Sequence, residues 1–188
     1  MCTPVGHSLA ALGIFYLAGR RPSRDETRRL GWFIVLANLP DFDFIPGILI
    51  GDPGRFHHTY SHSIGFVLLI MLLAYWLGRP ALGQRRLTTA MLAFALVGSH
   101  LLLDWLTWDP PGQNGQGIPL LWPWSDAYYL APQTIFLRVE RGDLLSAATL
   151  SNNFTGLLVE IAVLLPFVLL AAWWLQQRAT RYSEPGQG

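Results

Sequence analysis

The residues of this chain that could carry out chemistry are its five histidines and three of its aspartates. They are His7, His57, His58, His62, His100, Asp41, Asp43 and Asp104. Imidazole and carboxylate groups together bind zinc, manganese, iron and nickel, and eight candidates exceed the four ligands that one tetrahedral zinc ion uses. The set therefore predicts one or two divalent metal ions, with zinc the first choice.

A metal bound by such residues predicts hydrolysis. A pair of ions a few Å apart lowers the pKa of a bound water to about 7 and stabilises the attacking and leaving oxygens at phosphorus or at a carbonyl. The sequence has no serine nucleophile elbow, Walker loop, dinucleotide fingerprint or cysteine pair that would indicate another reaction.

The composition indicates that the elements carrying these residues lie in a membrane. Of 188 residues, 52% are apolar and only 13% are charged, which is too apolar for an ordinary soluble domain. The net charge of +1 gives no indication of a nucleic-acid partner, and the single Cys2 excludes an internal disulfide. We expect one membrane-embedded domain over residues 1–182 and a disordered tail over 183–188.

Five apolar segments approach the length of about 20 residues that a helix needs to cross the hydrocarbon core. They cover residues 5–19, 30–50, 63–78, 87–108 and 156–175. The predicted fold is therefore an all-α integral membrane bundle of about five transmembrane helices. Pro40 lacks a backbone donor, so the second segment should break there and continue irregularly through Asp41 and Asp43, beside a polar cavity.

The arginines predict the orientation of this bundle. All 13 basic residues are arginine, and ten of them follow the first, third and fifth segments. By the positive-inside rule those ends and the C-terminus are cytoplasmic, and the 51–62 and 109–155 connections lie outside. Asp104 lies one helical turn after His100. All eight candidate residues then line a polar, outward-facing metal cavity.

The long 109–155 connection is predicted to cap this cavity. It is rich in proline, glycine and tryptophan, which is typical of an interfacial segment, and a short amphipathic helix is expected near 133–145. A cavity rimmed by tryptophans within reach of membrane lipids favours an amphiphilic or phosphorylated substrate. The rim tryptophans are Trp105, Trp108, Trp122 and Trp124. Nothing in the sequence indicates a protein partner.

Each part of the set also has a simpler explanation. His7 alone could be an interfacial histidine, and His100 with Asp104 could be a structural hydrogen-bonded pair. The aspartates at 41–43 could cap a turn, and the histidines at 57–62 could form a pH-sensing loop. All of these must hold together to remove the metal, although unpaired ionisable groups at membrane depth cost several kcal/mol.

Two other classes of function compete with hydrolysis. A metal carrier or sensor would bind the ion reversibly, but the candidate ligands lie at one end only, whereas carriers distribute ligands along a path. A non-catalytic scaffold would use the metal for structure and leave no open coordination position. Glu160 is expected to snorkel or to cap a helix and is not counted as a ligand.

Several short motifs occur in a characteristic order. They are Gly6-His7, Leu39-Pro40-Asp41-Phe42-Asp43, the stretch His57-His58-Thr59-Tyr60-Ser61-His62-Ser63, then 98–104 with Leu106-Thr107, and 119–123. Over most of the first two thirds of the chain they resemble the YdjM-like family of bacterial LexA-regulated, membrane-bound, metal-dependent hydrolases. The type of motif is distantly similar to the motifs of the zinc-dependent phospholipase C class. The resemblance implies a multi-pass protein of the bacterial inner membrane.

The resemblance also implies a ligand set and shows one departure from it. The implied metal ligands are His7, Asp41, Asp43, His57, His62, His100 and Asp104. The family usually has arginine directly after the first histidine of the third motif, where this sequence has His58, and threonine is common at Ser61. His58 therefore either replaces an anion-binding arginine or adds a ligand.

Roles within this set follow from both lines of reasoning. The core ligands are expected to be His57, His62, His100, Asp41 and Asp104. His7 and Asp43 are expected to complete a second metal site or to supply a general base. Direct catalytic roles are predicted for Asp43, His58 and Asp104.

Overall fold

The computed structural model describes residues 1–188 except 53, 78–84, 110–115, 142, 144 and 184–188. Within these residues the protein has six α-helices and two 3-10 turns, and no strand occurs among them. The all-α prediction is therefore confirmed for the described chain. Of the predicted disordered tail at 183–188, all but Ser183 lies outside the described residues.

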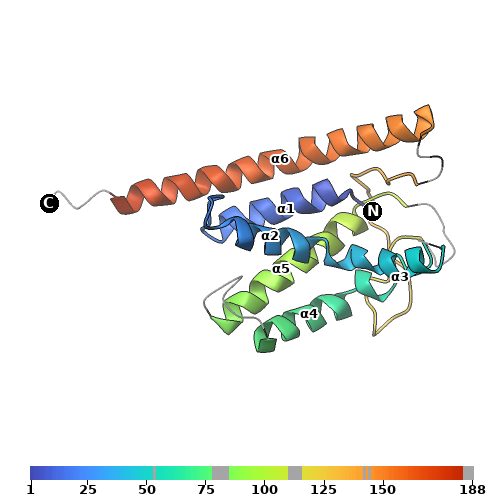
Figure 1. The fold of residues 1–188 in the computed structure, drawn as a ribbon, viewed down its shortest axis with the longest axis horizontal. Helices are drawn as coiled ribbons and strands as arrows, with labels where there is room; N and C mark the ends of the chain where they lie inside the picture. The colour runs from blue at the N-terminus through green and yellow to red at the C-terminus, as the bar shows by residue number, and fades with distance from the viewer. Residues whose placement is uncertain (53, 78–84, 110–115, 142, 144, 184–188) are drawn as a thin grey trace.

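The helices follow one another along the chain with short connections at first and one long connection near the end (Figure 1). Their bounds are α1 Pro4–Leu17, α2 Thr27–Ala37, η1 Leu39–Asp43, α3 Phe44–Leu49, η2 Tyr60–His62, α4 Ile64–Leu77, α5 Arg86–Trp105 and α6 Ala147–Ser183. In Figure 1 the N-terminus, α3 and the long connection gather at one end, and the C-terminus lies at the other.

Two helices are long and apolar enough to cross a membrane. These are α5 and the part of α6 from Ala147 to Arg178, and the bent pair formed by α2 with η1–α3 is a third candidate. Helices α1 and α4 have 14 residues each, so each spans about 21 Å, less than the ~30 Å hydrocarbon core. Helices occur in all five predicted segments, but five full crossings stay a prediction.

The predicted break at Pro40 is confirmed. Helix α2 ends at Ala37, and the axis turns by 61° through η1 into α3. The amide of Asp41 donates to the carbonyl of Asn38 at 3.2 Å. An uninterrupted helix would have used the Ala37 carbonyl instead. The break therefore frees that carbonyl for another partner.

Helix α1 lies close along α6 because of two glycines. A Cβ atom at Gly6 would come within 2.6 Å of Glu160 Oε2, and one at Gly13 within 2.2 Å of Phe167 Cε1. Small residues of this kind let two membrane helices approach closely. The start of α1, which carries His7, is thereby fixed beside the start of α6.

The amphipathic helix expected at 133–145 is wrong for the described residues of that stretch, which are irregular. Phe136 forms an isolated bridge with Thr107, and its carbonyl accepts from the Trp108 amide at 3.0 Å. The Arg138 carbonyl accepts from the Asn152 side chain at 2.9 Å. Residues directly after α5 and in the first turns of α6 thus supply hydrogen bonds to this backbone in place of helical ones.

Candidate metal centre

The candidate ligands come from separate segments that meet at the N-terminal end of the molecule (Figure 1). Helix α1 supplies His7, η1 supplies two aspartates, the 57–62 segment supplies three histidines, and the last turns of α5 supply His100 and Asp104. All eight predicted residues lie in this one cluster and contact one another. Their individual roles stay predictions.

The centre of the cluster is a group of four side chains, Asp41, His62, His100 and Asp104, which we call the central group. Asp104 Oδ2 lies 3.2 Å from the Nε2 atoms of both His62 and His100. Asp41 Oδ1 lies 3.5 Å from His62 Nε2 and 3.6 Å from His100 Nε2. The two Nε2 atoms are 3.2 Å apart.

These separations fit a tetrahedral metal ion. Zinc binds histidine nitrogen and carboxylate oxygen at about 2.0–2.1 Å, which gives tetrahedron edges of roughly 3.3 Å. Both oxygens of Asp41 and Oδ2 of Asp104 are buried and have no hydrogen-bond partner among the described residues. Buried carboxylate oxygens normally have a partner, and a cation would supply it here.

In both histidine rings of the central group, the Nδ1 atom, which points away from the other members, lies close to an oxygen atom. His100 Nδ1 lies 2.8 Å from the Ala37 carbonyl, the group that the break at Pro40 leaves free. A carbonyl only accepts, so Nδ1 carries the proton and Nε2 presents its lone pair. His62 Nδ1 lies 3.2 Å from Asp43 Oδ2 and 3.0 Å from the Ser61 hydroxyl. Both rings are therefore oriented as metal ligands usually are.

Asp104 is held in the same way. It lies one turn after His100 on α5, and its Oδ1 accepts from the Cys2 amide at 2.9 Å. Only Oδ2 is left to face the two Nε2 atoms. The helical spacing predicted this pairing, whereas the contact with the Cys2 backbone could not be seen in the sequence.

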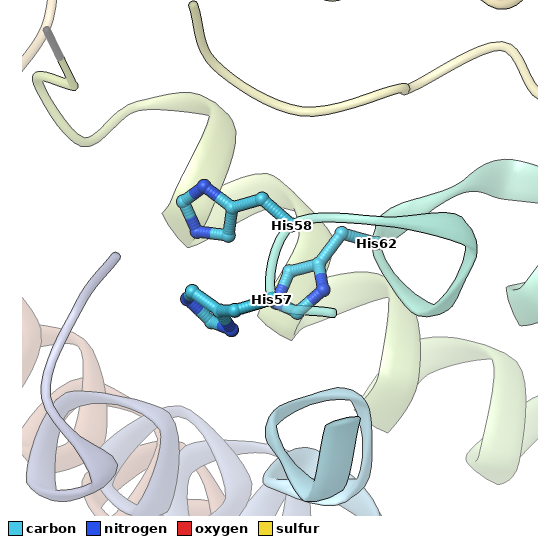
Figure 2. Close-up of side chains that lie close together, drawn as sticks. All are labelled: His57, His58 and His62. Atoms are coloured by element: carbon cyan, nitrogen blue, oxygen red, sulfur yellow. The ribbon is translucent and has the colours of Figure 1, made fainter. Parts of the chain in front are cut away.

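A second gathering consists of His57 and His58 beside His62. Figure 2 shows the three rings close together at the turn of the segment that carries them. His57 Nδ1 lies 3.0 Å from Asp43 Oδ1, and His58 Nδ1 lies 3.4 Å from Asp109 Oδ2. Burial lowers the pKa of His57 to about 3 and also lowers the pKa of His58. Both rings are therefore neutral at pH 7, the form in which imidazole binds metal.

His7 and Asp43 lie next to the central group without belonging to it. The His7 ring stacks on His100 with centroids 3.8 Å apart, and its Nε2 is 3.6 Å from Asp104 Oδ1. The two oxygens of Asp43 face the Nδ1 atoms of His57 and His62, behind the rings. The predicted roles of His7 and Asp43 as ligands or bases stay predictions.

Two further carboxylates lie near the cluster, of which sequence reasoning missed Asp109 and expected Glu160 to snorkel or to cap a helix. Asp109 contacts His58 and also lies 3.7 Å from Arg138 Nη1. The feature of the sequence that could have identified Asp109 is its position directly after the fourth apolar segment. Glu160 does not snorkel, because it is fully buried and accepts from the Thr3 amide at 2.7 Å and from the Thr3 hydroxyl. Thr3 caps α1, so Glu160 anchors the start of that helix.

The fold and the site together define a helical membrane protein with a buried histidine and aspartate group that could hold a metal ion. The model of the YdjM inner membrane protein family matches residues 1–179, and the chain belongs to this family. The family resemblance noted from the sequence motifs is confirmed.

One curated relative is the inner membrane protein YbcI of Escherichia coli (strain K12), to which the chain is 32% identical over 102 residues. The match covers 53% of this chain and 56% of the relative, so the chain spans a little over half the length of that relative. No solved structure matches the chain significantly. Family and relative both support an inner-membrane location.

Proposed function

We propose that this protein is a membrane-bound hydrolase that depends on a divalent metal, zinc first, held by the central group. The observation that carries the proposal is the buried set of four ligand atoms, all within 4.8 Å of one another, whose carboxylate oxygens lack partners among the described residues. Because the four side chains would fill a tetrahedron, catalysis requires the metal to expand to five-coordinate; it would then polarise a substrate oxygen and favour ionisation of a water at neutral pH.

The ligand types support catalysis over a purely structural metal. Structural zinc sites are mostly built from cysteine, whereas this group has two histidines and two carboxylates. The side chains of His62, His100 and Asp104 are fully buried, but that of Asp41 is 11% exposed. The Asp41 side is therefore where water and substrate would enter. Asp43 would position His57 and His62 from behind.

An arginine near the site supports an anionic substrate. The Arg141 guanidinium lies 4.4 Å from the centre of the Phe44 ring, and that ring stacks on His57 at 3.9 Å. The described residues include every aspartate and glutamate except Glu184, and none of them pairs with Arg141. Arg138, in contrast, pairs with Asp109 and Glu140. The guanidinium of Arg141 contacts the Met1 sulfur but no described carboxylate, so its charge would be available for a phosphoester group.

Exposed aromatic side chains at the same end support an amphiphilic substrate. Trp108 is 48% exposed and Trp124 is 70% exposed. Tryptophan favours the headgroup region, where a phosphorylated lipid or related ester would reach the site. The arginine distribution supports an outward-facing site and a cytoplasmic C-terminus.

The test is to purify the protein in mild detergent, measure bound metal by elemental analysis, and assay phosphodiester and phospholipid hydrolysis. We expect metal in the wild type, and loss of both metal and hydrolysis in the His100→Ala and Asp41→Ala variants. Asp126→Ala is the matched control, because Asp126 is an exposed aspartate of the long connection outside the cluster.

Two results would reject parts of the proposal. A wild type that binds no metal under any supplementation would reject the metal site. Bound metal without turnover of any tested ester would reject the hydrolase and favour a structural scaffold or a metal carrier. The carrier is the weaker alternative, because both clusters of candidate ligands found among the described residues lie at one end of the molecule.

A further inference from the structure

We propose that His57 and His58 bind a second divalent cation beside the central group, with Asp104 between the two ions. This inference rests on the proposed metal-dependent function and adds a ligand pair to it. The family resemblance implies His57 and Asp104 as ligands, but His58 is the residue at which the sequence departs from the family motif, so the pairing of His57 with His58 is specific to this chain.

The backbone of His58 is the first observation. It has a φ of +56°, and it is the only residue other than glycine with positive φ among the described residues. This conformation is unfavourable for a histidine and persists where the surrounding structure requires it, often at functional sites. Here it turns the ring inward, so that the side chain is only 11% exposed.

The ring nitrogens of His57 and His58 repeat the arrangement in the central group. In each ring Nδ1 faces a carboxylate, Asp43 for His57 and Asp109 for His58. The Nε2 atoms of both rings are buried and have no hydrogen-bond partner among the described residues. An oxygen behind Nδ1 with a vacant Nε2 in front is the usual geometry of a metal-binding histidine.

Asp104 links this pair to the central group. Its Oδ2 lies 3.9 Å from His58 Nε2 and 3.2 Å from His62 Nε2. Two-metal hydrolytic sites hold their ions about 3.5–4 Å apart, a separation that one carboxylate can serve. His58 is therefore close enough to the central group for Asp104 to contact a cation in each, and His57 offers a ligand atom within 4.8 Å of that of His58.

The second cation is expected to bind more weakly than the first. Two imidazoles and a shared carboxylate are fewer protein ligands than the four of the central group, and they leave positions for water or an anionic substrate oxygen. His58 is also partly exposed, whereas His62 and His100 are fully buried. The ligand class is a borderline divalent ion such as zinc, cobalt or manganese.

The experiment is a metal titration of metal-free protein in detergent, with Co²⁺ or Zn²⁺ as the probe and bound metal measured by equilibrium dialysis. We expect two equivalents in the wild type, and one in His58→Arg and in His57→Gln. Arginine at position 58 places a fixed positive charge near the proposed ion. Titration with Mn²⁺ should show the electron paramagnetic signal of a coupled pair in the wild type and an isolated ion in both variants.

The outcomes separate this inference from the proposed function. One equivalent in the wild type would overturn the second site and leave the first intact, and no bound metal would overturn both. Two equivalents in His58→Arg and His57→Gln would also overturn it. Gel filtration and thermal unfolding check that both variants fold, and two equivalents in Asp126→Ala would show that an unrelated aspartate does not matter.

Discussion

The two halves of α5 bury the same helical face with different chemistry. In the first part, residues 86–97, which we call the first half, Ala93, Leu96 and Val97 are fully buried, and Leu96 packs in a cluster with Phe15 and Phe33. In the last turns the buried polar residues are His100 and Asp104, and Leu101 and Leu103 are buried beside them. The difference lies in what faces them. Phe33 of the regular part of α2 covers the first half, whereas the break after Ala37 presents a carbonyl and Asp41 to the second.

A membrane helix can therefore carry a buried polar site at the point where the neighbouring helix is broken. A continuous α2 would use the Ala37 carbonyl internally and would leave His100 Nδ1 without that acceptor. The apolar half should then determine stability, and the polar half should determine metal binding.

The largest effect is expected for Asp104→Ala. This change removes the carboxylate that faces His58, His62 and His100. Bound metal and ester hydrolysis should both fall below detection, as measured by elemental analysis and by phosphodiester turnover. If this variant kept a full equivalent of bound metal, the polar part of α5 would not determine metal binding.

The opposite result is expected for Leu96→Ala. Leu96 is fully buried between α1 and α2, and truncating such a side chain typically costs about 2–5 kcal/mol of stability. Thermal unfolding in detergent should show this loss, while the metal content per folded chain stays at the wild-type value. A loss of metal without loss of stability would show that the two halves are not separate.

A smaller effect on the metal is expected for Asp43→Asn. Asp43 holds the Nδ1 atoms of His57 and His62, and loss of such a partner typically weakens metal affinity about 10–100-fold. Competition with a chelator of known affinity measures the change. An unchanged affinity would mean that Ser61 alone is sufficient to orient His62.

The smallest effect is expected for Arg141→Gln, which lies outside both halves of α5. If Arg141 binds the anionic part of the substrate, KM for an anionic amphiphile should rise about tenfold, within the range for one charge-assisted hydrogen bond. Metal content should not change. Arg55→Gln is the control, since Arg55 lies over Phe56 rather than Phe44.

The sequence could predict those parts of this division that depend on local rules. Pro40 cannot donate, so the break was predictable, and the four-residue spacing of His100 and Asp104 placed both on one face. The apolar segments predicted where helices form. They also predicted that the first and third helices are short, and α1 and α4 have 14 residues each.

The remaining features depend on contacts between segments far apart in the chain. The partner of His58 is Asp109, 51 positions away, and no periodicity joins them. The apolar pattern at 133–145 suited a helix, but the end of α5 pairs with that backbone instead. Glu160 was expected to snorkel or to cap a helix, and its burial was not predictable because the Thr3 amide that binds it lies 157 positions away.

The length of α6 allows the depth of the site within the membrane to be estimated. Arg178 lies over the Trp174 ring at 4.4 Å, a pair typical of a membrane surface. If this pair marks one surface, a crossing of about 20 residues places the other near Phe154. Glu160 then lies about 9 Å inside the hydrocarbon, together with the Thr3 that it holds. Spin labels along α6 would measure that depth. A site anchored there would face the ester bonds of a lipid more directly than its outermost headgroup atoms.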